Sequence, residues 1–137
     1  MAGKRSLTKM SPVQQEAREH RRALITRLSE TIPLLKERGV EKILVYGSIL
    51  DEKRFQWISD IDLALSGKRF SFREQLRILS LLEEVFGKDG FDAVFLTGEE
   101  LAPRKAVLDS ILKEGVDAEQ LVKSSQDPDR GGAVKPR

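Results

Sequence analysis

Hydrophobic residues recur at helical spacing in the first third of the chain. Leu24, Leu28 and Leu35 form a thin apolar stripe in a segment rich in helix formers. Ser11-Pro12 supplies an N-cap followed by proline at the first helical position, so a helix is predicted from residue 12 to about residue 30. Pro33 has no backbone N–H, and we expect it to kink or break this helix, leaving a short second piece that ends at Gly39.

Three short apolar segments have the pattern of β-strands. Residues 42–46 form an apolar run that stops at Gly47, as expected for a buried strand entering a tight turn. Residues 60–65 alternate, so on a strand Asp60, Asp62 and Ala64 share one face while the large apolar residues share the other. Residues 91–96 are apolar except for Asp92.

Two further helices are predicted. The pair Ser71 and Glu74 forms a capping box for a helix that runs to about Phe86. Its expected buried face consists of Leu76, Leu79, Leu82 or Glu83, and Phe86. A last helix covers residues 104–114, and residues 116–122 add a short edge strand or a helical turn. The order of elements predicts an α/β or α+β domain with a small mixed sheet packed by helices.

Length and composition fit one domain with a tail at either end. We expect residues 1–10 to be a disordered basic arm, 11–123 the folded domain, and 124–137 a disordered tail. With 24 Lys and Arg against 22 Asp and Glu, the net charge is only +2 and does not argue for nucleic-acid binding. The chain lacks cysteine and any apolar run of membrane-spanning length, so we expect a soluble cytoplasmic protein without membrane contact.

The residues with the most chemistry lie between Gly47 and Asp62. Carboxylates on one face of a strand have Cα atoms roughly 6–7 Å apart, so they repel unless a cation neutralises them. Hard oxygen ligands on a rigid strand suit Mg²⁺, which fills its other positions with water and substrate phosphates. A Gly47-Ser48 turn lets backbone N–H groups and a hydroxyl approach a phosphate. These features indicate phosphoryl or nucleotidyl chemistry.

Tyr46-Gly47-Ser48 followed by Ser59-Asp60-Ile61-Asp62-Leu63 resembles the minimal nucleotidyltransferases of the DNA polymerase β superfamily, over about residues 34–115. The resemblance implies the nucleotidyltransferase fold and ATP as the substrate. It also implies that Asp60 and Asp62 hold two Mg²⁺ ions that bridge the triphosphate and the attacking hydroxyl. Asp92 would complete the nucleophile-side metal or accept the proton, while Gly47 and Ser48 would hold the outgoing phosphates.

Asp92 also stands out without the resemblance. An aspartate buried in an apolar strand is unfavourable unless it is paired or bound to a metal. The alternative is a residue at the end of an edge strand, exposed to water.

The loop after Ser48 departs from the family pattern. Eleven residues, 49–59, separate Ser48 from Asp60, one more than is common, and residues 49–52 replace the usual basic and glycine-containing run. Lys53 or Arg54 could hold a β- or γ-phosphate instead, or be surface charge. Phe55 and Trp57 could stack on a nucleobase, although packing that pins the loop is favoured.

A basic cluster lies in the first helix and consists of Arg18, His20, Arg21 and Arg22. Glu16 and Glu19 accompany it, so a solvated helix face is favoured over a nucleic-acid patch. His20 is the only histidine, and its polar surroundings argue against a catalytic or ligand role.

The length of the chain limits what kind of molecule can accept the nucleotide. Only 45 residues (137 minus 92) follow Asp92, too few for a second substrate domain, so a macromolecular acceptor is favoured. Stand-alone minimal nucleotidyltransferases resemble antitoxins that bind an all-helical HEPN ribonuclease toxin and, in some cases, adenylylate it on a tyrosine. This implies an antitoxin of a toxin-antitoxin system with a HEPN partner. The alternatives are a catalytically weak binding module, a dimeric small-molecule nucleotidyltransferase and, ranked last, a nucleic-acid binder.

Overall fold

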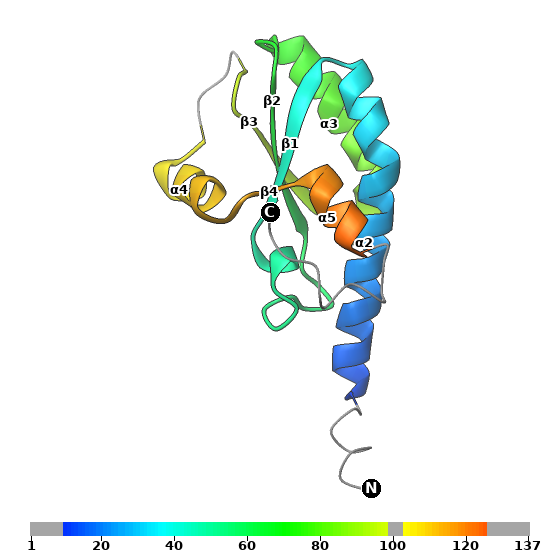
Figure 1. Cartoon of the computed structure of the whole chain (residues 1–137). Helices are drawn as coiled ribbons and strands as arrows, with labels where there is room; N and C mark the ends of the chain where they lie inside the picture. The colour runs from blue at the N-terminus through cyan, green and yellow to red at the C-terminus, as the bar shows by residue number, and fades with distance from the viewer. Residues whose placement is uncertain (1–9, 99–102, 126–137) are drawn as a thin grey trace, which may run out of the picture.

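A computed structural model describes residues 10–98 and 103–125 of the chain. Four strands form one sheet, and the helices lie on its two faces (Figure 1). In chain order the elements are α2 (Pro12–Glu37), β1 (Val40–Tyr46), η1 (Ser48–Leu50), β2 (Ile61–Gly67), α3 (Phe72–Phe86), η2 (Gly87–Asp89), β3 (Phe91–Phe95), α4 (Lys105–Glu114), β4 (Val116–Asp117) and α5 (Ala118–Ser125). The predicted arm up to residue 9 and the tail from residue 126 lie outside the described residues.

The sheet is mixed, with strand order β3-β2-β1-β4. β1 pairs antiparallel with β2 and with β4, whereas β2 and β3 run parallel. The parallel pair requires a crossover, which α3 supplies between β2 and β3. The predicted fold class, a small mixed sheet packed by helices, is therefore confirmed.

The main core lies between the sheet and the layer of α2, α3 and α5. Ile61, Leu63 and Leu65 of β2 point into it and are fully buried, as the alternating pattern predicts. The opposite face carries a smaller cluster in which Tyr46 and Ala64 pack against Ile111 of α4. Of the helices in residues 10–98 and 103–125, only α4 contributes to this cluster, so the described residues cover the second face only in part.

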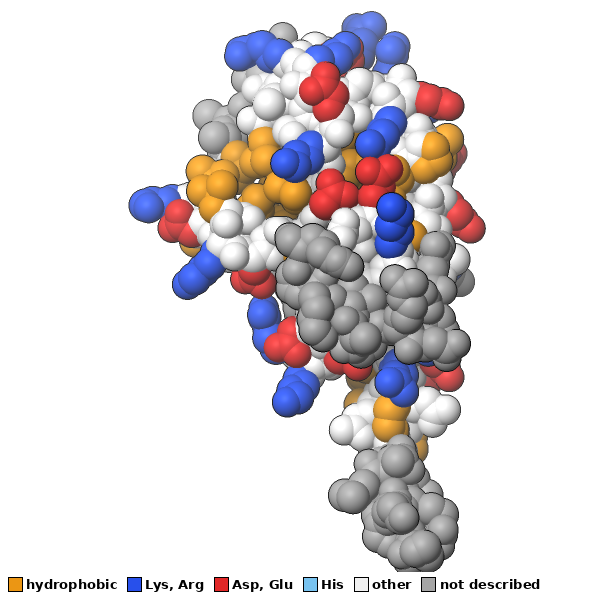
Figure 2. Space-filling model, in the orientation of Figure 1, with side chains coloured by type: hydrophobic (Ala, Val, Ile, Leu, Met, Phe, Trp, Pro, Cys, Tyr) orange, Lys and Arg blue, Asp and Glu red, His pale blue; other side chains and the backbone are white. Residues whose placement is uncertain are grey.

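Apolar side chains remain exposed around α4. Figure 2 shows them gathered on the left of the view, over α4 and the neighbouring part of the sheet. Leu112 is 77% exposed, and Leu44, Val94, Leu96 and Val107 are only partly buried.

The sequence predicts a kink or a break of the helix at Pro33, and the break is wrong, because α2 continues as one helix to Glu37. Ile32 and Leu35, on either side of the proline, are buried in the main core and hold the last turns in place. Pro33 itself is exposed, so the carbonyl of Ser29 that loses its helical N–H partner lies on the side of α2 that water can reach. Packing of the flanking turns outweighs the loss of one hydrogen bond.

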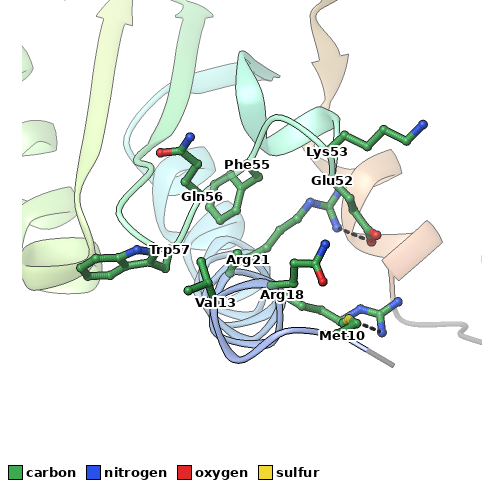
Figure 3. A pocket seen from close by; sticks show the side chains of 11 residues that line it. Met10, Val13, Arg18, Arg21, Glu52, Lys53, Phe55, Gln56 and Trp57 are labelled. Atoms are coloured by element: carbon green, nitrogen blue, oxygen red, sulfur yellow. Dashed lines mark hydrogen bonds and ion pairs between the residues drawn. The ribbon is translucent and has the colours of Figure 1, made fainter. Parts of the chain in front are cut away.

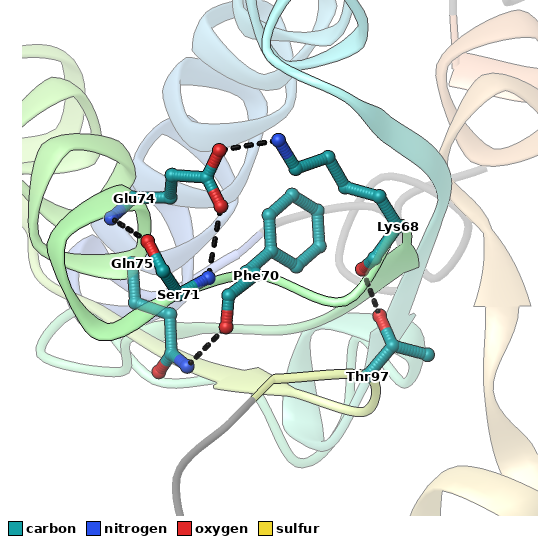
Figure 4. Close-up of polar contacts among 6 residues, drawn as sticks. All are labelled: Lys68, Phe70, Ser71, Glu74, Gln75 and Thr97. Carbon is teal, nitrogen blue, oxygen red and sulfur yellow. Dashed lines mark hydrogen bonds and ion pairs between the residues drawn. The ribbon is translucent and has the colours of Figure 1, made fainter.

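The capping box of α3 is confirmed. The Ser71 hydroxyl accepts from the Glu74 N–H at 3.1 Å, and the Glu74 carboxylate accepts from the Ser71 N–H at 2.8 Å (Figure 4). Glu74 also pairs with Lys68. Thr97 donates to the Lys68 carbonyl at 2.8 Å, which ties the end of β2 to the turn after β3.

The predicted buried face of α3 is partly wrong. Leu82 and Phe86 are buried as expected, but Leu76 is 48% exposed, and Ile78 and Gln75 are buried instead. The Gln75 amide donates to the Phe70 carbonyl at 3.2 Å, which satisfies a polar group that the spacing alone would place outside (Figure 4).

The last part of the chain uses both of the predicted alternatives. Val116–Asp117 form the edge strand β4, and the helix α5 follows it directly to Ser125, two residues into the segment predicted as tail. Within residues 10–98 and 103–125, no helix is long and apolar enough to cross a membrane.

Candidate active site

Three polar side chains from neighbouring strands lie in a row at one end of the sheet. Tyr46, the last residue of β1, lies opposite Asp62 in the β1–β2 register. Asp92 of β3 lies opposite Asp62 on the other side. Partners in register project from the same face, so the three side chains stand on the partly covered face that α4 flanks. The strand pairing thus brings together two acids that are thirty residues apart in the sequence.

Asp60 lies just before the first residue of β2 and joins this group from the side. The backbone N–H of Ile61 donates to the Gly90 carbonyl at 3.3 Å, which draws the start of β2 against the turn before β3. The three predicted acids, Asp60, Asp62 and Asp92, therefore lie at one end of the sheet.

The electrostatics of Asp62 reflect this crowding. The pKa of the Asp62 carboxyl is raised to about 6, first by burial and then by the negative charges of Asp92 and Asp60. The pKa of Tyr46 is raised to about 12, first by burial and then by the charges of Asp62 and Asp92. In the described part of the chain none of the three aspartates forms an ion pair with a basic side chain.

Two glycines with positive φ fit closely against these carboxylates. Gly47 has φ 86°, and a methyl group there would overlap Oδ2 of Asp62. Gly90 has φ 90°, and a methyl group there would overlap Oδ1 of Asp60. Both positions require glycine for backbone conformation and for space. The sequence predicts a phosphate contact for Gly47, and the structure adds the close fit of Gly90 against Asp60.

The donor chemistry suits a hard divalent cation. Carboxylates without a cationic partner provide the hard oxygen ligands that Mg²⁺ takes from a protein, usually one or two at a time. In residues 10–98 and 103–125, however, no three acidic or histidine side chains converge at metal-ligand spacing. Any ion would be held by fewer than three of these side chains at once, with substrate or water oxygens completing the shell.

The exposure of Asp92 differs from what the sequence predicts. Its side chain is exposed, so the argument that burial demands a metal or partner for Asp92 is wrong. β3 is an edge strand, which leaves one side of Asp92 open to water. Its place in the site rests instead on its register opposite Asp62.

The two candidate phosphate-binding side chains of the loop do not contact the aspartates. Arg54 pairs with Glu114 at the end of α4, with an N–O distance of 3.7 Å. Lys53 is exposed and lines a cavity of about 660 Å³ between the first turns of α2 and the loop (Figure 3). None of the three aspartates lines this cavity.

The aromatic pair of the loop is divided between two roles. Phe55 is 4% exposed and stacks on His20 of α2 with ring centroids 5.3 Å apart, which confirms the packing role for this residue. Trp57 is 54% exposed and lines the same cavity as Lys53. His20 and its neighbour Arg21 are also half-buried against the loop, so the basic cluster is not uniformly solvated.

Comparison with known proteins agrees with the geometry. The family model described as Polymerase beta, Nucleotidyltransferase matches residues 29–117. The chain belongs to this family. The match contains Gly47, Ser48 and all three aspartates, and it begins after His20 and Arg21. No curated protein matches the chain. Membership supports nucleotidyl transfer as the class of activity.

Proposed function

We propose that the protein transfers AMP from Mg-ATP to a hydroxyl of a macromolecule, as an antitoxin that binds and adenylylates a helical HEPN ribonuclease toxin. The observation that supports the first part is the gathering of Asp60, Asp62 and Asp92 at one end of the sheet, where burial and then the two neighbouring charges raise the pKa of Asp62 to about 6. Such perturbed carboxyls gather where a protein binds cations or moves protons.

Asp60 and Asp62 would hold the cation, with Asp92 completing the nucleophile side. When bound, Mg²⁺ supplies electrostatic stabilisation of the triphosphate and lowers the pKa of the attacking hydroxyl. The raised pKa of Asp62 belongs to the site without a cation, and a bound cation would favour the charged carboxylate. Asp92, which lies in register beside Asp62, would then be the carboxylate that accepts the proton of the hydroxyl. Gly47, with its positive φ, leaves room for phosphate oxygens to approach the backbone beside Ser48.

A protein acceptor fits the surface beside the aspartates. The face of the sheet that carries them is only partly covered, and the exposed side chain of Leu112 borders it. Apolar exposure of this kind favours a protein surface over a polar sugar. The antitoxin role and the HEPN partner rest on the resemblance described above.

A second candidate is a nucleotidyltransferase-fold module that neutralises a partner by contact without transfer. Arg54 is engaged by Glu114, and Lys53 lines a cavity away from the aspartates. The loop therefore offers no basic side chain that is already directed at a triphosphate. Failure to bind Mg-ATP together with intact partner binding would select this candidate.

The deciding experiment follows label from ATP labelled at the α-phosphate into a purified helical toxin, with Mg²⁺ present. The native protein is compared with Asp60→Asn, with Asp62→Asn and with Asp109→Asn, which removes an exposed acid of α4. We expect label with the native protein and Asp109→Asn, and a loss of at least about a hundredfold with either site variant.

Label that persists in Asp62→Asn would refute the assigned site. An unlabelled toxin that still forms a complex with the native protein would refute transfer and support neutralisation by contact. Label on a small molecule would refute the macromolecular acceptor.

A further inference from the structure

The segment of residues 49–59 connects Ser48 to Asp60 and so joins the two halves of the proposed site. The β1–β2 register places Tyr46 opposite Asp62, whereas Ser48 and Asp60 lie just beyond the paired ends of the two strands. Their positions therefore also depend on the conformation of this segment.

Hydrogen bonds within the segment close its turns, for example from the Phe55 N–H to the Asp51 carbonyl and from the Gln56 N–H to the Ser59 hydroxyl. Contacts with the rest of the domain then determine where the segment as a whole lies.

Two neighbouring residues of α2 supply those contacts, one near each end of the loop. The guanidinium Nε of Arg21 donates to the Ile49 carbonyl at 2.6 Å. The ring Nε2 of His20 lies 2.7 Å from the Ser59 carbonyl. A carbonyl oxygen only accepts, so His20 must carry its proton on Nε2. Two adjacent residues of one helical turn thus bind the segment at the residue after Ser48 and at the residue before Asp60.

Further contacts hold the middle of the loop against the same turn. The His20 ring stacks on the buried ring of Phe55. Arg21 also forms an ion pair with the Glu52 carboxylate, drawn as a dashed line in Figure 3, with an N–O distance of 3.7 Å. Burial lowers the pKa of Arg21, against the opposing effect of Glu52. A partly desolvated guanidinium depends strongly on its protein partners.

The helix that provides these contacts, α2, is held in place by the main core. α2 is buried in the main core from Leu24 onward, one turn after Arg21. His20 and Arg21 therefore project from a rigid support rather than from a second loop. Both precede residue 29, where the family match begins, so they lie outside the matched nucleotidyltransferase domain.

We propose that His20 and Arg21 are positioning residues that clamp the loop of residues 49–59 and so hold Ser48 and Asp60 at the separation that nucleotide binding requires. The part that concerns nucleotide rests on the proposed function. The clamp itself concerns only the conformation of the loop. Neither residue needs to touch substrate.

The chain offers matched substitutions. His20→Gln keeps an N–H donor near the position of Nε2, whereas His20→Phe keeps a ring to stack on Phe55 and removes the donor. Arg21→Met removes the donor and keeps the aliphatic stem. Arg22→Met is its control, because Arg22 is the next residue along and is exposed.

Loop conformation is measured first in the nucleotide-free protein. Hydrogen exchange of the amides of residues 49–59 is followed by mass spectrometry, together with acrylamide quenching of Trp57, the only tryptophan of the chain. We expect exchange about tenfold faster and stronger quenching in Arg21→Met and His20→Phe. His20→Gln and Arg22→Met should stay close to the native protein.

The second measurement is the KM for ATP and the kcat of the transfer reaction. The KM for ATP should rise about tenfold in Arg21→Met and His20→Phe, with a smaller change in kcat and with rescue by His20→Gln. A loss of stability alone would leave KM unchanged in the molecules that remain folded, and that result would overturn the positioning role. If hydrogen exchange of residues 49–59 and quenching of Trp57 match the native protein in both Arg21→Met and His20→Phe, the proposal that these residues clamp the loop is wrong. If the native protein binds no nucleotide, the proposed function fails, while loop exchange still decides the clamp.

Discussion

Replacement of Asp62 by Asn should make the nucleotide-free protein more stable at neutral pH. The two side chains have nearly the same shape, and no hydrogen bond to the Asp62 carboxylate is present within the described residues. What the substitution removes is a negative charge that is half-buried and faces two other carboxylates. We therefore expect the charged Asp62 carboxylate, which the proposed activity needs, to lower the free energy of unfolding.

The size of the effect follows from the pKa. The Asp62 pKa rises from the ordinary 3.8 to about 6, so the charged form is disfavoured in the folded protein. At 1.36 kcal/mol per pH unit the difference corresponds to about 3 kcal/mol, an upper bound. Asp62 is partly exposed, and solvent screening reduces this to about 1.5 kcal/mol.

The sign of the pH dependence is also determined. Below pH 3.8 the carboxyl is protonated in both folded and unfolded chains, so there is no penalty. The penalty grows as pH rises from about 4 to about 6, where the folded protein also loses the proton, and is constant above that range. The native protein should therefore lose stability relative to Asp62→Asn across this window.

The assay is urea unfolding of both proteins from pH 4 to pH 8, with EDTA and then with Mg²⁺. With EDTA, the stability difference should favour Asp62→Asn at pH 7.5 and shrink toward zero at pH 4. Mg²⁺ should reverse the order by stabilising the native protein, because it binds only the folded site. Asp109→Asn should show neither trend. A native protein that is more stable than Asp62→Asn at pH 7.5 in EDTA would refute the reasoning.

Two further predictions test the same site. Tyr46 is the only tyrosine of the chain, so ultraviolet titration should show one phenolate transition near pH 12 in the folded protein, and a midpoint at the ordinary value of 10.0 would contradict the buried, acid-flanked position. Gly47→Ala should cost at least about 2 kcal/mol in urea unfolding, because alanine at a positive φ is strained and its methyl group overlaps a carboxylate. Gly87→Ala, where a methyl group meets nothing within 4 Å, is the control, and an equal loss there would remove the argument.

Local signals in the sequence determined most elements of this protein. The Ser71 and Glu74 capping box, the apolar run before Gly47 and the alternation around Asp62 each depend on neighbours a few residues away. Local hydrogen bonding and side-chain period report such features directly. The motif residues were identified in the same way, because their spacing along the chain is part of the pattern.

Tertiary structure decided how those elements meet. The register that sets Tyr46 and Asp92 on either side of Asp62 comes from strand pairing, which no local pattern reports. Tertiary structure also overrode a local preference, because packing in the core keeps α2 helical on both sides of Pro33.

The contacts of His20 and Arg21 with the loop span 39 and 28 residues, so the sequence showed only a basic cluster on a helix. Their partners are backbone carbonyls, which every residue possesses and which therefore leave no mark in the sequence. Local preference follows from covalent neighbours, whereas these contacts exist only once the packed core has brought distant segments together.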